Sequence, residues 1–177
     1  MESHTTTMAT DAPQLDRRRE RFGGLLERHR RIVFKVANTY AWQPDDRDEL
    51  VQEIAAQLWR AFPGYDAQRS FSTWMYRIAL NVAISHVRSA SHRDKHAVPL
   101  DETMHDIADD NGADPEADQQ VRALHRFIAQ LDKLSRALLL LYLEDHSYRE
   151  MANILGITET NVATKISRLK QRIRTEI

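Results

Sequence analysis

Cysteine is absent from the 177-residue sequence. Its absence excludes disulfides, thiolate zinc sites and cysteine nucleophiles, and it suits a reducing compartment. Long apolar runs are also missing, since the longest, residues 137–143, falls far short of the roughly 20 residues that span a bilayer. The first ten residues, MESHTTTMAT, lack the apolar stretch of a signal peptide. We therefore expect a cytoplasmic protein with no membrane insertion.

Glycine and proline are scarce, with five residues of each type. Long stretches of the chain are rich in Ala, Leu, Arg, Glu and Gln, and these residues favour helices over strands. The length suffices for one ordinary domain or for two small ones. The composition therefore predicts an all-α protein.

The formal net charge is only −1, which is unusual for a protein that binds DNA unaided, because phosphate neutralisation supplies most of that affinity. The charges are unevenly distributed, since residues 97–118 contain eight acidic residues and neither Lys nor Arg. Together with two prolines and a glycine, they predict a flexible acidic linker over residues 95–118. The predicted order is thus a mobile tail (1–20), a small helical domain (21–94), the linker, and a second small helical domain (119–177).

Three amphipathic helices are predicted in the first domain. Apolar residues recur at intervals of three and four over residues 25–40, 48–62 and 71–88. Along the third of these helices, a separate polar stripe comprises Arg77, Asn81, Ser85 and Arg88. On the second, the polar residues outside the apolar stripe form either a merely solvated face or a surface for a protein partner.

The loop before the third helix contains Tyr65, and the helix itself begins with Phe71 and Trp74. Phe71 and Trp74 lie near the apolar stripe and are predicted to be core residues. Tyr65 precedes the stripe, and an aromatic ring in a loop can stack on an unpaired base for about 1–3 kcal/mol.

The last two helices of the second domain predict a helix-turn-helix. Helices are expected near residues 121–130 and 133–143, then over 147–155 and 159–176. Between the last two, a small residue (Ala152), a turn glycine (Gly156) and a β-branched core residue (Val162) have the spacing typical of this motif. We expect a positive φ at Gly156, which glycine adopts at little cost. A solvated helical hairpin remains the alternative for this segment.

The final helix has an inward and an outward face. The inward stripe comprises Val162, Ile166, Leu169 and Ile173, and Thr158 is placed to cap the helix. The outward residues are hydrogen-bond donors suited to phosphates and base edges: Thr160, Asn161, Thr164, Lys165, Arg168 and Arg172.

Both halves of the chain resemble the extracytoplasmic-function sigma factors of bacterial RNA polymerase. The segment DELVQEIAAQLWRAF is similar to the family's core-binding helix, and FSTWMYRIALNVAISHVR is similar to the helix that recognises and melts the −10 promoter element. The segment LLLLYLEDHSYREMANILGITETNVATKISRLKQRIR resembles the region that reads the −35 element. The family commonly has Leu-Pro where this chain has Leu131-Asp132, a departure that we expect to leave the fold untouched.

The resemblance implies a transcription initiation factor that binds polymerase core, at the β′ clamp helices and the β flap, and brings it to promoter DNA. An anti-sigma protein is a further candidate partner. The implied core-binding residues are Asp48, Glu49, Leu50, Gln52 and Glu53. The implied −10 residues are Gly64, Tyr65, Asp66, Arg69, Arg77, Asn81, Ser85 and Arg88, and the −35 residues are the six outward donors of the last helix.

No catalytic residue, metal site or cofactor is expected. The eight histidines do not have metal-ligand spacing, and a Gly-rich phosphate loop is absent. The protein is therefore predicted not to be an enzyme by itself. The alternative functions are a stand-alone helix-turn-helix regulator with a sensing or dimerising first domain, and a helical adaptor that binds only proteins.

Overall fold

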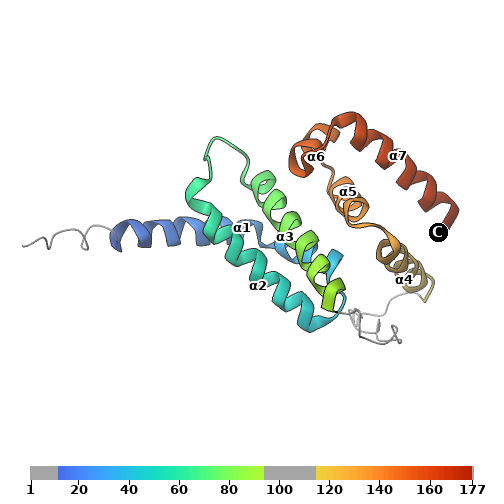
Figure 1. The fold of residues 1–177 in the computed structure, drawn as a ribbon, viewed down its shortest axis with the longest axis horizontal. Coiled ribbons are helices and arrows are strands. Elements are labelled where there is room, and N and C mark those ends of the chain that lie inside the picture. The colour runs from blue at the N-terminus through green and yellow to red at the C-terminus, as the bar shows by residue number, and fades with distance from the viewer. Residues whose placement is uncertain (1–11, 94–114, 177) are drawn as a thin grey trace, which may run out of the picture.

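The computed structural model describes residues 12–93 and 115–176, and this part of the chain contains helices and turns without a strand (Figure 1). The finding confirms the predicted all-α fold. In chain order the elements are α1 (Ala12–Tyr40), α2 (Pro44–Ala61), a short 3-10 helix η1 (Phe62–Gly64), α3 (Phe71–Arg93), α4 (Pro115–Gln130), α5 (Lys133–Leu143), α6 (Tyr148–Leu155) and α7 (Glu159–Glu176).

Helices α1, α2 and α3 pack on one another as the first bundle. Their apolar stripes meet in a core whose fully buried side chains include Val36, Leu50, Ile54, Leu58 and Met75. Full burial of such a side chain contributes about 1.5–3 kcal/mol. The bundle thus holds the outer faces of α2 and α3 in fixed relative positions.

Helix α1 begins at Ala12, so the prediction of a tail over residues 1–20 is wrong for residues 12–20. The anchor is Phe22, which is buried with its ring 5.3 Å from that of Trp59 and 5.1 Å from that of Phe62. Once such a packed turn exists, each further helical residue adds a hydrogen bond at little cost. Residues 1–11 lie outside the described part of the chain.

Two other boundaries differ from prediction. Helix α3 continues to Arg93, beyond the expected end at Arg88. Helix α4 starts at Pro115, so residues 115–118, which were assigned to the linker, are helical. Proline is favourable in the first helical turn, where its missing N–H has no intrahelical partner in any case. The rest of the predicted linker lies outside the described residues.

Helices α5, α6 and α7 pack together and carry the helix-turn-helix. Gly156 adopts a φ of +67° between α6 and α7, as predicted. A Cβ at this position would meet no atom within 4 Å, so the backbone conformation and not space favours glycine. The Thr158 side chain accepts a hydrogen bond from the N–H of Asn161 at 3.1 Å, which confirms the predicted cap.

The departure at Leu131-Asp132 has a local structural role. Asp132 is the N-cap of α5, and its carboxylate accepts hydrogen bonds from the N–H groups of Leu134 and Ser135 at 3.1 and 3.0 Å. A proline here would have no such side chain, and aspartate is among the best N-cap residues. The substitution is therefore compatible with the same helix start.

The two helical groups dock against each other in this structure. Helix α3 packs against α6 and α5, and α1 packs against α5. The Tyr40 hydroxyl donates a hydrogen bond to the Lys133 carbonyl at 2.6 Å, and the Tyr76 and His146 rings meet edge to face at 5.0 Å. Lys35 forms an ion pair with Glu144 across the same junction.

Burial at this junction changes the pKa of both tyrosines. Desolvation raises the pKa of Tyr40 well above its usual value. Burial and the neighbouring Glu144 carboxylate together raise the pKa of Tyr76 to about 12. Both hydroxyls therefore stay protonated near neutral pH and remain hydrogen-bond donors across the junction.

We expect Lys35→Glu to loosen the docking, because it would place two carboxylates at one site. The double variant Lys35→Glu/Glu144→Lys should restore the attraction. Because the chain has no cysteine, cysteines introduced at exposed Arg60 and Gln171 would be the only thiols available for dye labelling. Energy transfer between the dyes should fall in the single variant and recover in the double one, whereas equal transfer in all three proteins would show that the pair does not hold the junction.

Candidate nucleic-acid and polymerase interfaces

The outer face of α2 presents four of the five predicted core-binding residues to solvent: Asp48, Glu49, Gln52 and Glu53. Leu50 is different, because none of its surface is exposed. The prediction that Leu50 contacts the polymerase core is therefore wrong, because its side chain lies in the interior of the bundle. A residue directly beside exposed positions on a helix can point to the core, since successive residues are rotated by about 100°.

Glu53 has an intramolecular partner. Its carboxylate lies 3.2 Å from Nδ1 of His86 on α3. Glu53 therefore links α2 to α3 and is not only a solvent-facing charge. Glu49 makes no side-chain contact of this kind among the described residues, so it gives a cleaner test of the α2 face.

The loop over residues 64–70 is ordered by its own hydrogen bonds. The carboxylate of Asp66 accepts a hydrogen bond from the N–H of Gln68 at 2.9 Å, and the carbonyl of Asp66 accepts one from the N–H of Arg69 at 3.0 Å. The Tyr65 hydroxyl closes the loop by donating to the Arg69 carbonyl at 2.7 Å. A loop that is already ordered loses less entropy when it binds a ligand.

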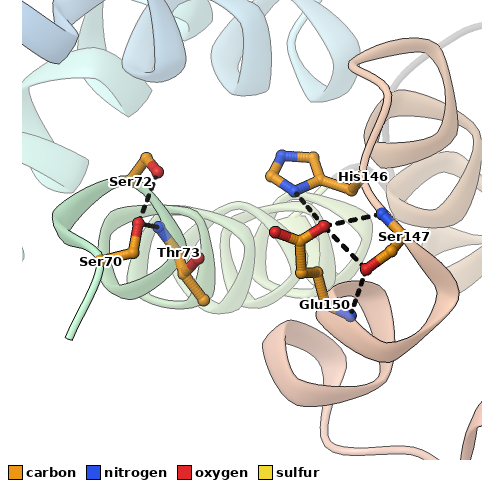
Figure 2. Close-up of polar contacts among 6 residues, drawn as sticks. All are labelled: Ser70, Ser72, Thr73, His146, Ser147 and Glu150. Atoms are coloured by element: carbon orange, nitrogen blue, oxygen red, sulfur yellow. Dashed lines mark hydrogen bonds and ion pairs between the residues drawn. The ribbon is translucent and has the colours of Figure 1, made fainter.

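Hydroxyl groups mark the junction between this loop and α3. The Ser70 and Ser72 hydroxyl oxygens are 2.9 Å apart, and the N–H of Thr73 donates to Ser70 Oγ at 3.5 Å (Figure 2). The carbonyl of Ser70 accepts the first helical hydrogen bond, from the N–H of Trp74. The loop is thus attached rigidly to the start of α3.

Tyr65 belongs to an aromatic cluster and is partly buried. Its ring lies 6.0 Å from that of Phe62 at an interplanar angle of 17°, and it meets the rings of Phe71 and Trp74 at 5.3 and 5.0 Å. Phe71 is buried, as predicted, and Trp74 is partly buried. The structure therefore places all three rings together, although the sequence suggested a separate role for Tyr65. These contacts restrict how a base could stack on Tyr65.

The polar stripe of α3 continues from the loop. Arg77, Asn81 and Ser85 are exposed along it, at intervals of four residues. The side chain of Arg88 lies outside the described part of the structure. The stripe follows the loop along the chain, and both lie on the first bundle.

The inner face of α7 agrees with prediction. Val162, Ile166 and Leu169 are buried, and Ile173 is partly buried. On the outer face, four predicted contact residues are exposed: Thr160, Asn161, Thr164 and Arg168.

Two of the predicted donors on α7, Lys165 and Arg172, are only partly exposed. The Arg172 guanidinium lies 5.2 Å from the centre of the Phe127 ring and pairs with Glu176 at 2.9 Å. Lys165 is partly buried on the side of Asp132. Burial raises the pKa of Asp132, but hydrogen bonds from Ser135 and Leu134 and the charge of Lys165 hold this pKa below its usual value. The structure therefore does not group Arg172 and Lys165 with the four exposed residues.

One local feature of the helix-turn-helix was missed in the sequence. Ser147 and Glu150 form a complete capping box at the start of α6, in which Glu150 N–H donates to Ser147 Oγ at 3.2 Å and Ser147 N–H donates to the Glu150 carboxylate at 2.7 Å (Figure 2). The signal was present, since Ser-x-x-Glu before an apolar run is the usual signature of this motif. His146 lies 3.9 Å from the same carboxylate.

Over residues 12–93 and 115–176, no group of three or more His, Asp or Glu side chains is placed to hold a metal ion. No helix in this part of the chain is long and apolar enough to cross a membrane.

Comparison with known proteins matches both halves of the chain to one family. The model of Sigma-70 region 2 matches residues 25–93, and that of Sigma-70 region 4 matches residues 121–173. The RNA polymerase sigma factor NccH of Alcaligenes xylosoxydans xylosoxydans is 25% identical over 157 residues, covering 86% of this chain and 84% of NccH. The ECF RNA polymerase sigma factor SigW of Bacillus subtilis is 24% identical over 165 residues, covering 88% of each.

A solved structure has the same fold. The sigma factor RpoE from Bartonella quintana, crystallised with the anti-sigma factor NepR, aligns with a TM-score of 0.72 and 17% sequence identity. The alignment covers 88% of this chain and 96% of that chain.

Proposed function

Because the chain belongs to the sigma-70 family, as an extracytoplasmic-function sigma factor that directs RNA polymerase to promoters, we propose how its surfaces divide that task. The α2 face binds the polymerase core, the loop 64–70 and the α3 stripe bind single-stranded −10 DNA, and α7 reads the −35 duplex. In this proposal the domains correspond to residues 21–94 and 119–177. The protein acts in the cytoplasm and is not itself an enzyme, since the phosphodiester chemistry belongs to the polymerase.

The exposed acidic face of α2 supports the polymerase assignment. Asp48, Glu49 and Glu53 concentrate negative charge on one side of a helix whose other side is locked in the core. Opposite charge on the β′ clamp helices would steer the encounter and set the register of binding. The β flap is the proposed second contact, with the region 4 domain.

The geometry of α7 carries the −35 assignment. A left-handed turn at Gly156 sets α7 against α6, and the N-terminal half of α7 exposes Thr160, Asn161 and Thr164. In helix-turn-helix proteins this part of the second helix contacts base edges in the major groove. Arg168 extends the same exposed surface by one turn.

The docked arrangement of the two domains must open for this function. The positions −10 and −35 are about 25 base pairs apart, which corresponds to roughly 85 Å of duplex at about 3.4 Å per base pair. Helix α3 packs against α6, and the eight residues of α6 span only about 12 Å. Simultaneous binding of both elements therefore requires the domains to separate.

A stand-alone regulator of the helix-turn-helix class is the alternative, and one experiment separates the two. The purified protein should bind polymerase core in a pull-down and support specific run-off transcription with that core alone. A regulator would give transcripts only when another sigma factor is supplied. Retention of core without initiation would indicate a protein-binding adaptor and would refute the proposed function.

An anti-sigma protein is proposed as a regulatory partner. The Bartonella relative was crystallised with such a protein. Because the α2 face would have to be free for polymerase, a partner of this class would compete with core for the protein. A candidate anti-sigma protein that reduces the amount of polymerase core retained in the pull-down would be identified as this partner.

Arg168→Ala is expected to weaken −35 duplex binding by about 1–3 kcal/mol if the side chain reads a base edge, with the loss confined to one position of the site. If the side chain only contacts phosphate, all duplexes should weaken alike. Titration against duplexes varied at single positions measures the difference. Arg172→Ala is a useful comparison, because Arg172 is held by Phe127 and Glu176. No loss on any duplex for Arg168→Ala would exclude Arg168 from the interface.

A further inference from the structure

Three arginines near the start of α1 surround a hollow that no comparison assigns. The hollow has a volume of about 270 Å³ and is lined by Arg17, Arg18, Arg21, Phe62, Pro63 and Tyr65. The arginines precede residue 25, where the match to Sigma-70 region 2 begins. They lie on the part of α1 that the sequence alone assigned to a tail.

The position of these arginines follows from the packing of α1. Phe22 holds this part of the helix against Trp59 and Phe62. The Arg21 guanidinium lies 5.9 Å from the centre of the Phe62 ring. Residues separated by three or four positions share a helix face, so Arg17, Arg18 and Arg21 point to one side.

The charge of this site is not neutralised within the described structure. Neither Arg17 nor Arg18 forms an ion pair with an acidic side chain in the described ranges, and both are exposed. The acidic neighbours on the helix, Asp16 and Glu20, do not line the hollow. Arg19 carries the same charge but also does not line it.

The lining combines two kinds of group. Guanidinium groups bind phosphate through paired hydrogen bonds, and they keep their charge at any physiological pH. Partly buried Tyr65 and Phe62, which is only 6% exposed, line the hollow beside them. Basic side chains along the backbone and aromatic rings beside the bases are the usual composition of sites for single-stranded nucleic acid.

The hollow is also continuous with the proposed −10 surface, because Tyr65 belongs to both the lining and the loop 64–70. We propose that Arg17, Arg18 and Arg21 bind backbone phosphates of the single strand, at the nucleotides next to the one held by the loop. This inference rests on the proposed function of the loop. It extends the DNA path from α3 across the loop to the first turns of α1.

The test compares Arg18→Glu with the matched control Arg19→Glu, each assembled with polymerase core. The probe is a labelled oligonucleotide carrying the non-template −10 strand of a promoter that the parent protein transcribes in run-off assays. Arg18→Glu should weaken binding about tenfold, a loss typical for a charged hydrogen bond. Arg19→Glu should weaken it much less. Circular dichroism and core binding should be the same for both variants, since both positions are exposed.

A second probe distinguishes phosphate contact from general attraction. In this oligonucleotide, neutral methylphosphonates replace the phosphates that flank the captured base. The difference between Arg18→Glu and the parent should largely disappear on this probe. The salt dependence of binding should also be smaller in the variant, by about 0.7 in log–log slope for each lost contact.

The outcomes separate this inference from the proposed function. If the parent holoenzyme does not bind the strand, the proposed role of the first domain fails, and this inference fails with it. If the parent binds but both variants lose affinity equally, or neither loses any, only the arginine site is refuted. The site would likewise be refuted if Arg18→Glu weakened binding to the −35 duplex as much as binding to the single strand. An affinity difference between Arg18→Glu and the parent that persisted on the neutral probe would also refute it, because both results indicate non-specific attraction.

Discussion

Glu49→Lys is expected to weaken the binding of polymerase core by about 10- to 100-fold, because it would place a positive charge on the face that we assign to a basic partner. On α2, Glu49 is a better position than Glu53 for testing the interface. Glu53 also bonds to His86 on α3, so a change at Glu53 would disturb the bundle as well as the interface.

A pull-down or an affinity titration with purified core measures this effect. The control is Glu27→Lys, which makes the same charge change at an exposed position on α1, where Glu27 pairs, among the described residues, only with exposed Arg30 at 3.5 Å. Helical content and thermal stability should match the parent in both variants. Core affinity that is unchanged by Glu49→Lys, or reduced equally by Glu27→Lys, would contradict the assignment of the α2 face.

Asn81→Ala is expected to impair promoter opening while leaving core binding and −35 duplex binding near normal. Opening a duplex costs stacking of about 1–2 kcal/mol per base step. The captured bases must return that energy through stacking and hydrogen bonds, and Asn81 is an exposed amide in the middle of the α3 stripe. Its loss should therefore lower the open fraction or change the preferred −10 base.

The loop can be tested in the same assay without disturbing the aromatic cluster. Because Tyr65 packs on Phe62, Phe71 and Trp74, only residues 66–69 should be replaced and Tyr65 should be kept. A loop variant of this kind should show the same opening defect as Asn81→Ala.

Permanganate reactivity around −10 reports the opening directly. A preformed bubble template should partly rescue both variants, since the cost of melting is then already met. Asn38→Ala, an exposed amide on α1, should behave as the parent does. If Asn81→Ala and the loop variant open the native promoter as well as the parent, with the same −10 preference, the DNA-binding site in the first domain is misassigned.

Interactions between residues close together in the sequence were sufficient to predict much of the fold of this protein. The scarcity of Gly and Pro and the long stretches of helix-favouring residues predicted the all-α fold, and apolar periodicity located the helices of both domains. At the helix-turn-helix, Ala152, Gly156 and Val162 were predictable because their roles depend on neighbours a few residues away. The positive φ at Gly156 and the cap at Thr158 are of this local kind.

The candidate site was only partly predictable, because periodicity does not define how far a residue is buried. The family resemblance placed Leu50 among the core-binding residues, but this side chain is fully buried in the first bundle. Arg172 has the spacing of an outward donor, but its guanidinium lies over the Phe127 ring on another helix and pairs with Glu176. In each case the deciding neighbour comes from a different element of the fold.

The sequence by itself determined the helical fold, the order of the two family regions and the faces that carry polar residues, since these follow from short-range spacing. Only the tertiary structure decided that the domains dock, through pairs such as Lys35 and Glu144, which are 109 positions apart. It also decided that the first turns of α1 bring Arg17 and Arg18 beside the loop. Such contacts depend on how separate helices pack, and helix packing is set by the shape and burial of many side chains at once.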